Sequence, residues 1–189
     1  MKRNPADLQH RPFMTPIWLF GIGGFVTLGV AIFALWIWAT ANSTTVIVIR
    51  HAEKELGSLV DPPLSAAGEA RAALLARLFG DPKAPGRLDA IYTSAWLRNR
   101  STAAPLAAQL GLVPIVAPTN DSQGLARRVL REHSGGRVMI VGHADTVPAV
   151  VAELAGESDI PGIDEHDYGV MYIVTVPRVG HANLLRLNY

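Results

Sequence analysis

Strand and helix signals alternate along residues 42–189, and this alternation constrains the fold more than any other feature of the chain. A β-branched run at Thr44 to Ile49 has the length of a buried strand, and Ser65 to Phe79 carry apolar residues at helical spacing, with Ser65 as the predicted N-cap. Further strands are predicted at 90–93, 112–117 and 138–141. Each is followed by a predicted helix, at 97–110, 122–133 and 146–154 respectively. Such alternation buries a mostly parallel sheet between helices. We therefore predict an α/β fold, a three-layer αβα sandwich, with a terminal hairpin of strands at 170–176 and 182–187.

The N-terminal part of the chain has a different character. No charged residue occurs between Arg11 and Arg50, and residues 17–41 are almost entirely apolar. A helix needs about 20 apolar residues to cross a bilayer, and Trp18, Trp36 and Trp38 suit the headgroup regions. The sequence thus predicts one N-terminal transmembrane helix, and residues 17–41 would contact the lipid bilayer.

Charge around this segment predicts its orientation. Lys2 and Arg3 precede it, so the positive-inside rule places a short tail, residues 1–16, in the cytoplasm. Residues 42–189 would then form an extracytoplasmic (periplasmic) domain of a single-pass membrane protein. Cleavage after Ala41 is an alternative, although the apolar run exceeds that of a usual signal peptide and favours an uncleaved signal anchor.

Composition excludes several classes of function. The chain has 17 Lys+Arg and 16 Asp+Glu, a formal net charge of +1, so it lacks the general positive field that holds nucleic acid. It has no cysteine, which excludes disulfides, cysteine nucleophiles and cysteine-bound metals.

Polar residues cluster where the predicted strands end. Arg50 and His51 follow the first strand, Arg98 lies one turn beyond the strand at 90–93, and His143 follows the strand at 138–141. Ligands of open α/β sheets bind at these carboxyl ends. Arginine forks bind phosphate oxygens, and an imidazole can attack phosphorus. The sequence therefore predicts a phosphoryl-group site.

Four motifs in order carry a family resemblance. Their sequences are Arg50-His51-Ala52-Glu53, Leu64 to Gly68 (LSAAG), Ser94 to Ala103 (SAWLRNRSTA) and Val141-Gly142-His143. Over residues 44–155 these resemble the histidine phosphatase superfamily, the phosphoglycerate-mutase-like fold. The resemblance implies that His51 is phosphorylated and that Arg50, Arg98 and His143 bind the phosphate. It implies no metal and no cofactor.

The chain also departs from the family motifs. Ala52 stands where the family has glycine, Ala95 where it has proline, Asn99 where it has alanine, and Ser101 where it has glutamine. Ala52 would crowd the phosphate if its position required a positive φ.

The general acid is less defined by sequence. Asp121 matches the family's acid by its place after a later strand, and Glu53 matches by its nearness to His51. Asp121 could instead cap the helix at 122–133, and Glu53 could instead orient the pocket. We expect Asp145 to cap the next helix and the acidic run Asp164 to Asp167 to be solvated.

These observations predict a phosphatase acting on a phosphorylated small molecule or a phosphoprotein through a phosphohistidine on His51. The alternative is a catalytically silent phosphate-binding or scaffold module of the same fold.

Overall fold

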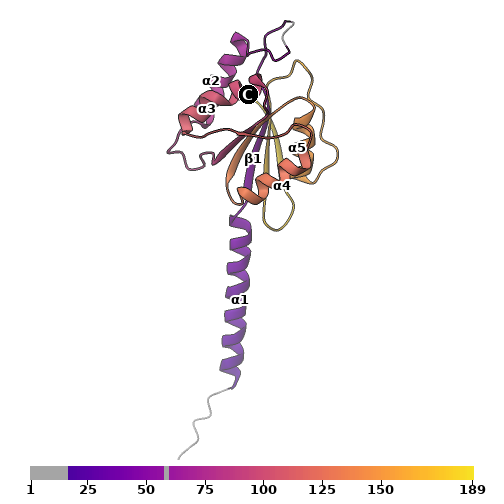
Figure 1. Cartoon of the computed structure of the whole chain (residues 1–189). Coiled ribbons are helices and arrows are strands. Elements are labelled where there is room, and N and C mark those ends of the chain that lie inside the picture. The colour runs from indigo at the N-terminus through magenta and orange to yellow at the C-terminus, as the bar shows by residue number, and fades with distance from the viewer. Residues whose placement is uncertain (1–16, 58–59) are drawn as a thin grey trace, which may run out of the picture. The chain divides into compact units, whose positions relative to one another are not determined.

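A computed structural model describes the backbone of residues 17–57 and 60–189 (Figure 1). Helix α1 covers Ile17–Ala41, the range predicted for the N-terminal helix, and its side chains are described for residues 24–38. The chain divides into two compact units between Trp38 and Ala39, and the second unit is Ala39–Tyr189. The predicted cytoplasmic tail, residues 1–16, lies outside the described residues.

In the described part of the chain, no helix has the length and apolarity needed to cross a membrane. The predicted transmembrane span at 17–41 is therefore not supported by the structure.

The second unit is built on one mixed sheet of six strands in the order β3-β2-β4-β1-β5-β6. Strands β3, β2, β4 and β1 pair in parallel with one another. Strand β5 is antiparallel to β1 on one side and to β6 on the other, and β5 and β6 form a hairpin at one edge. The strands are β1 Thr44–Arg50, β2 Ala90–Thr93, β3 Ile115–Val116, β4 Arg137–Gly142, β5 Val170–Val176 and β6 Asn183–Asn188. The mostly parallel α/β sheet predicted from the alternation is confirmed, with β1 at its centre.

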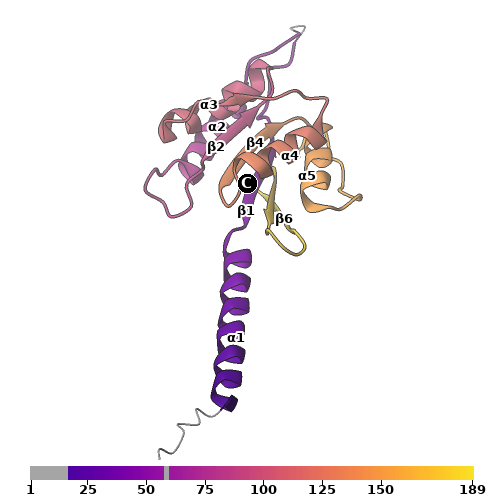
Figure 2. The ribbon, with the colours of Figure 1, turned by 60° about the horizontal axis from the view of Figure 1, so that its bottom comes forward.

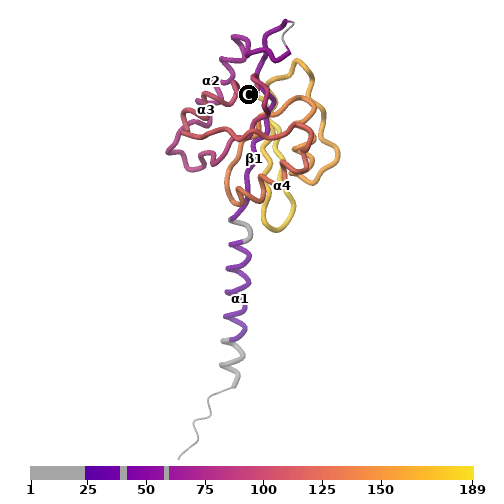
Figure 3. Tube along the Cα trace, viewed as in Figure 1, coloured from indigo at the N-terminus to yellow at the C-terminus, as the bar shows by residue number. Residues whose placement is uncertain are grey.

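Four helices connect these strands. They are α2 Ala66–Phe79, α3 Leu97–Leu110, α4 Ser122–Glu132 and α5 Thr146–Ala155. Helices α2 and α3 cover one face of the sheet, and α4 and α5 cover the other, as two views of the domain show (Figures 1 and 2). The chain trace separates the same two layers on either side of β1 (Figure 3).

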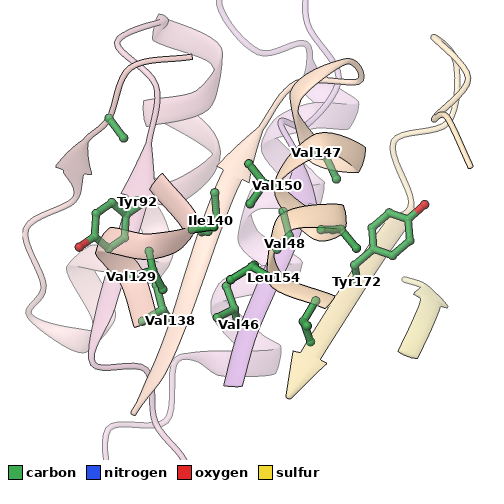
Figure 4. Packing of buried hydrophobic residues seen from close by; sticks show 14 of the residues in the cluster. Val46, Val48, Tyr92, Val129, Val138, Ile140, Val147, Val150, Leu154 and Tyr172 are labelled. Atoms are coloured by element: carbon green, nitrogen blue, oxygen red, sulfur yellow. The ribbon is translucent and has the colours of Figure 1, made fainter. Parts of the chain in front are cut away.

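Side-chain alternation along each strand supplies both faces of the core. In β1, Val46 and Val48 pack with α4 and α5, whereas Ile47 and Ile49 pack with α2 and α3. Figure 4 shows the first of these clusters, in which Tyr92 and Tyr172 flank the valines. Burying a side chain of this size contributes about 1.5–3 kcal/mol each, so the two clusters hold the strand ends in a fixed register.

The predicted strand at 112–117 is much shorter in the structure. Gly111 ends α3 in the left-handed conformation, with φ of 67°, and the Leu112 N–H bonds the Ala107 carbonyl at 2.9 Å as part of that helix cap. Pro114 then has no N–H to offer a neighbouring strand. Only Ile115 and Val116 remain to pair with β2.

Candidate active site

The two histidines are neighbours because their strands are parallel neighbours. Arg50 at the end of β1 is in register with Gly142 at the end of β4, and the His51 N–H donates to the Gly142 carbonyl at 2.9 Å. The chain then leads directly into His51 on one strand and His143 on the other. Their ring centroids are 5.4 Å apart. The predicted meeting of these two strand ends is thus present in the structure.

Arg98 lies between the two imidazoles. Its Nε is 3.3 Å from Nε2 of His51, and its Nη2 is 3.5 Å from Nδ1 of His143. The Trp96 ring lies 4.6 Å from the guanidinium carbon, and a carboxylate oxygen of Asp61 lies 3.5 Å from Nη1. One cation at the start of α3 therefore faces both histidines.

Hydrogen bonds define the tautomer of His51. Its Nδ1 lies 2.8 Å from the Ala52 carbonyl, which can only accept, so Nδ1 carries the proton. Arginine can only donate, so Nε2 presents its lone pair toward Arg98. Burial is the main cause that lowers the pKa of His51 to about 4. The hydrogen bond to the Ala52 carbonyl raises this pKa, whereas the charges of Arg98 and Arg50 lower it further. His51 is accordingly neutral near pH 7, with Nε2 free to act as a nucleophile.

His143 is held by a different set of contacts. Its Nε2 is 3.0 Å from the Ser94 hydroxyl, and its backbone N–H donates to the Thr146 hydroxyl at 2.9 Å. Because Nδ1 faces the Arg98 donor, we assign the proton to Nε2, which donates to Ser94. Burial, with the charge of Arg98, lowers the pKa of His143 below its usual value. The lowered pKa favours the neutral form of the His143 imidazole.

Arg50 joins the site to a distant loop. It is 5 % exposed, and its Nη1 donates to the carbonyls of Asp164 and Glu165 at 2.8 Å each. The Tyr168 ring stacks 4.0 Å from the guanidinium carbon, and its centroid lies 5.9 Å from that of His51. The Arg50 Nε is buried and has no partner among the described residues. Arg50 therefore connects the end of β1 to this loop.

These residues open into a cleft of about 900 Å³. Its lining includes Arg50, Lys54, Leu56, Trp96, Arg98, Thr119, Asn120, Asp145, Glu165, His166 and Tyr168, together with His51 and His143. Three of the lining residues, Arg50, Lys54 and Arg98, are cations, and two, Asp145 and Glu165, are carboxylates. The cleft therefore has an excess of positive charge, which suits a phosphate group. In the described part of the chain, no cluster of three or more histidine, aspartate or glutamate residues could hold a metal ion.

The motif at 64–68 supports the loop that carries His51. Ser65 accepts the Gly68 N–H with its hydroxyl and so caps α2, as predicted, and its own N–H donates to the Glu53 carbonyl at 2.9 Å. A Cβ at Gly68 would collide with that same carbonyl. Glycine at this position lets α2 pack directly on the backbone that follows His51.

The two predicted general acids have other partners. The Glu53 carboxylate is paired with Arg71 at 2.6 Å, and this hydrogen bond lowers its pKa, so Glu53 is a poor proton donor at neutral pH. Asp121 caps α4, its carboxylate accepting the Gly124 N–H at 2.7 Å. Neither is among the described residues lining the cleft. Asp145 both lines the cleft and caps α5, as predicted for the cap.

Several residues near the site were not predicted from sequence. Asp61 accepts the Leu97 N–H at 2.9 Å and so caps α3, whose own N-cap residue, Trp96, has no capping side chain. Thr102 accepts the N–H of Ala52 at 2.9 Å. The role of Tyr168 and of the loop carbonyls that bind Arg50 has no recognisable sequence signal. From the sequence, we expected Asp164 to Asp167 only to be solvated. Their side chains are exposed or half-buried, but their backbone binds Arg50.

Comparison with known proteins agrees with this geometry. A model of the histidine phosphatase superfamily (branch 1) matches residues 46–120, which contain most of β1, all of β2, α2 and α3, and His51 and Arg98. The match covers less than half of the chain. No curated protein matches the chain.

Solved structures of several phosphatases share the fold of this chain. The protein histidine phosphatase SixA, complexed with tungstate, is 20% identical with a TM-score of 0.61, over 76% of this chain and 96% of that one. A putative alpha-ribazole-5'-P phosphatase from Escherichia coli is 16% identical with a TM-score of 0.63, over 78% and 97%. A mycobacterial glucosyl-3-phosphoglycerate phosphatase is 16% identical with a TM-score of 0.60, over 77% and 99%. At these identities the likeness establishes the fold.

Proposed function

We propose that this chain is a phosphatase that hydrolyses a phosphomonoester or a phosphoprotein through a phosphohistidine on His51, without a metal. The observation that carries the proposal is the neutral Nε2 of His51, buried beside Arg98 at the base of a cationic cleft. One of these structural neighbours, the protein histidine phosphatase SixA, was solved in complex with tungstate, a tetrahedral oxyanion like phosphate. That neighbour supports oxyanion binding by this fold.

The proposed reaction has two half-reactions. In the first, Nε2 of His51 attacks phosphorus, the bond to the leaving oxygen breaks, and that oxygen departs with the electron pair and takes up a proton. The Ala52 carbonyl stabilises the positive imidazole ring through Nδ1. In the second, water attacks phosphorus, the P–N bond breaks, and inorganic phosphate and neutral His51 are released with one proton to solvent. Arg98 and Arg50 bind the phosphoryl oxygens throughout.

The alternative, a silent phosphate-binding module, is favoured by one observation: both predicted acids, Glu53 and Asp121, are engaged outside the cleft. The test is turnover of p-nitrophenyl phosphate by the full chain with EDTA present, because nitrophenolate leaves without a general acid. Release of nitrophenolate supports the phosphatase. Phosphate binding without turnover supports the silent module, and activity that EDTA abolishes contradicts the metal-independent reaction.

The acid assignments give the first prediction. We expect Asp121→Asn to change kcat for an alkyl phosphate by less than about threefold, because asparagine also caps helices and the Asp121 carboxylate caps α4 and does not line the cleft. Glu53→Gln should lower the unfolding free energy by about 1 kcal/mol through loss of the Arg71 pair, a part-exposed contact. Steady-state kinetics and chemical denaturation of both variants measure this. A drop of more than about tenfold in kcat for the alkyl phosphate alone, with nitrophenyl phosphate unaffected, would restore that residue as the acid.

The pKa of His51 gives the second prediction. Protonation removes the Nε2 lone pair, so activity is lost as pH falls through the pKa of the free enzyme. Because that pKa is lowered to about 4 from 6.5, kcat/KM should show no acidic limb near 6.5 and should stay level to about pH 5. The profile is measured with a substrate whose own ionisation is known and corrected for. An acidic limb at the usual histidine value would contradict the buried, neutral nucleophile.

We also propose that α1 anchors the chain in a lipid bilayer, with the N-terminus in the cytoplasm and residues 42–189 outside. The support is the absence of charge between Arg11 and Arg50 and the exposure of Phe25, Phe33 and Trp36, which are 77%, 59% and 61% exposed. Fractionation tests the anchor: the full chain should stay with membranes at alkaline pH and dissolve only in detergent. A reporter fused after Tyr189 tests the orientation. A full chain that remains in the aqueous fraction contradicts the anchor.

A further inference from the structure

Asn99 is a completely buried polar side chain next to Arg98 on α3. Its exposed fraction is 0%, and its Nδ2 donates to the carbonyls of Val141 at 2.9 Å and Gly142 at 3.0 Å. Its Oδ1 has no partner among the described residues. An amide buried with one unsatisfied oxygen costs free energy that an alanine would not. The family motif resembled by this segment has alanine here, so the asparagine calls for a reason particular to this chain.

The carbonyl of Gly142 supplies that reason. It accepts both the Asn99 Nδ2 at 3.0 Å and the His51 N–H at 2.9 Å. Gly142 is also the residue before His143. A single carbonyl therefore joins the helix that carries Arg98 to the two strand ends that carry the histidines.

The local packing makes this junction rigid. A Cβ at Gly142 would lie 3.0 Å from a methyl of Val147 and 3.1 Å from the Thr146 hydroxyl, so the strand end has little room to shift. On the other side, Thr102 of α3 accepts the Ala52 N–H, directly after His51. Asn99 and Thr102 thus fasten the first turns of α3 to the ends of β4 and β1.

We propose that Asn99 is a positioning residue that sets the distance between Arg98 and the two imidazoles. This inference rests on the proposed function for its kinetic consequences. The Arg98 contacts of 3.3 and 3.5 Å depend on where α3 begins relative to the strand ends. Displacement by about 1 Å within such a site can cost on the order of 100-fold in rate. Asn99 fixes that placement through two N–H donors and does not line the cleft.

The test compares Asn99→Ala and Asn99→Ser with a matched control, Thr44→Val. Thr44 is also buried and polar, but it accepts the Gly135 N–H at 3.0 Å at the opposite end of β1. In the full chain, histidine ring signals are titrated by NMR, inorganic phosphate affinity is measured by calorimetry, and kcat and KM are measured with nitrophenyl phosphate.

We expect both Asn99 variants to raise the ring pKa of His51, because Arg98 helps to lower it, and to weaken phosphate binding. We expect kcat to fall by about tenfold or more, with KM changed less than about threefold. Thr44→Val should lower the unfolding midpoint without altering the ring titrations, phosphate affinity or kcat.

Two sets of outcomes separate this inference from the proposed function. If Asn99→Ala does not fold, Asn99→Ser, which is smaller and still polar, decides the result. If the unmodified chain has no turnover, the proposed function fails, and the ring titrations and phosphate affinity still test the positioning role. The inference would be overturned if the Asn99 variants lost stability as Thr44→Val does but kept the His51 titration and the phosphate affinity of the unmodified chain.

Discussion

Replacing His51 by glutamine should reduce phosphatase turnover by at least about 10³-fold while the domain stays folded. Glutamine can occupy the buried position but has no ring nitrogen to attack phosphorus. The loss should appear in kcat for nitrophenyl phosphate, whose leaving group needs no proton, because the missing step is nucleophilic attack itself. Steady-state kinetics with EDTA present measures the effect.

His181→Gln is the matched control for this substitution. His181 is an exposed residue between β5 and β6 and does not line the cleft. It should keep full activity. Turnover by His51→Gln within about tenfold of the unmodified chain would mean that water attacks phosphorus directly, and the proposed covalent step would be wrong.

Arg98→Ala should have the second largest effect, a fall of about 10²–10³-fold in kcat/KM. Arg98 lies 3.3 Å from the imidazole of His51 and 3.5 Å from that of His143, so its removal would withdraw hydrogen bonds from the phosphoryl oxygens as charge develops. It should also raise the pKa of His51, because the charge of Arg98 helps to lower that pKa. Kinetics and a ring titration of His51 measure the two effects together.

Arg98→Lys and Arg100→Ala complete this experiment. Lysine keeps the charge but loses the planar fork, so it should recover only part of the activity. Arg100 is exposed, two residues along the same helix, and its removal should leave kcat/KM unchanged. Equal losses for Arg98→Ala and Arg100→Ala would indicate a general charge effect rather than a bond to the transferred group.

Sequence patterns predicted the α/β domain well because burial and backbone geometry act locally. Ala90–Thr93 and Leu97–Leu110 have the predicted bounds, and Ser65 caps α2 as expected. The strand predicted at 112–117 is too long for two reasons. The Leu112 N–H is used in the cap of α3, and Pro114 has no N–H to donate. That competition depends on how α3 ends in three dimensions.

The site was predictable where parallel strands end and less so where loops return to it. The register of β1 with β4 places His51 beside His143, which follows from the topology. The Arg50 contacts with Asp164 and Glu165 join residues more than 110 positions apart through backbone carbonyls, which carry no side-chain signature. The pairing of Glu53 with Arg71 likewise became visible only once α2 was placed.

The most direct measurement is to trap the covalent intermediate. The full chain is mixed with a ³²P-labelled phosphomonoester, quenched in alkali, where phosphohistidine survives, and digested for peptide mapping. The account predicts label on the peptide containing His51 that is lost in acid and absent from His51→Gln. Continued turnover with no labelled enzyme, or label on His143 instead, would contradict it.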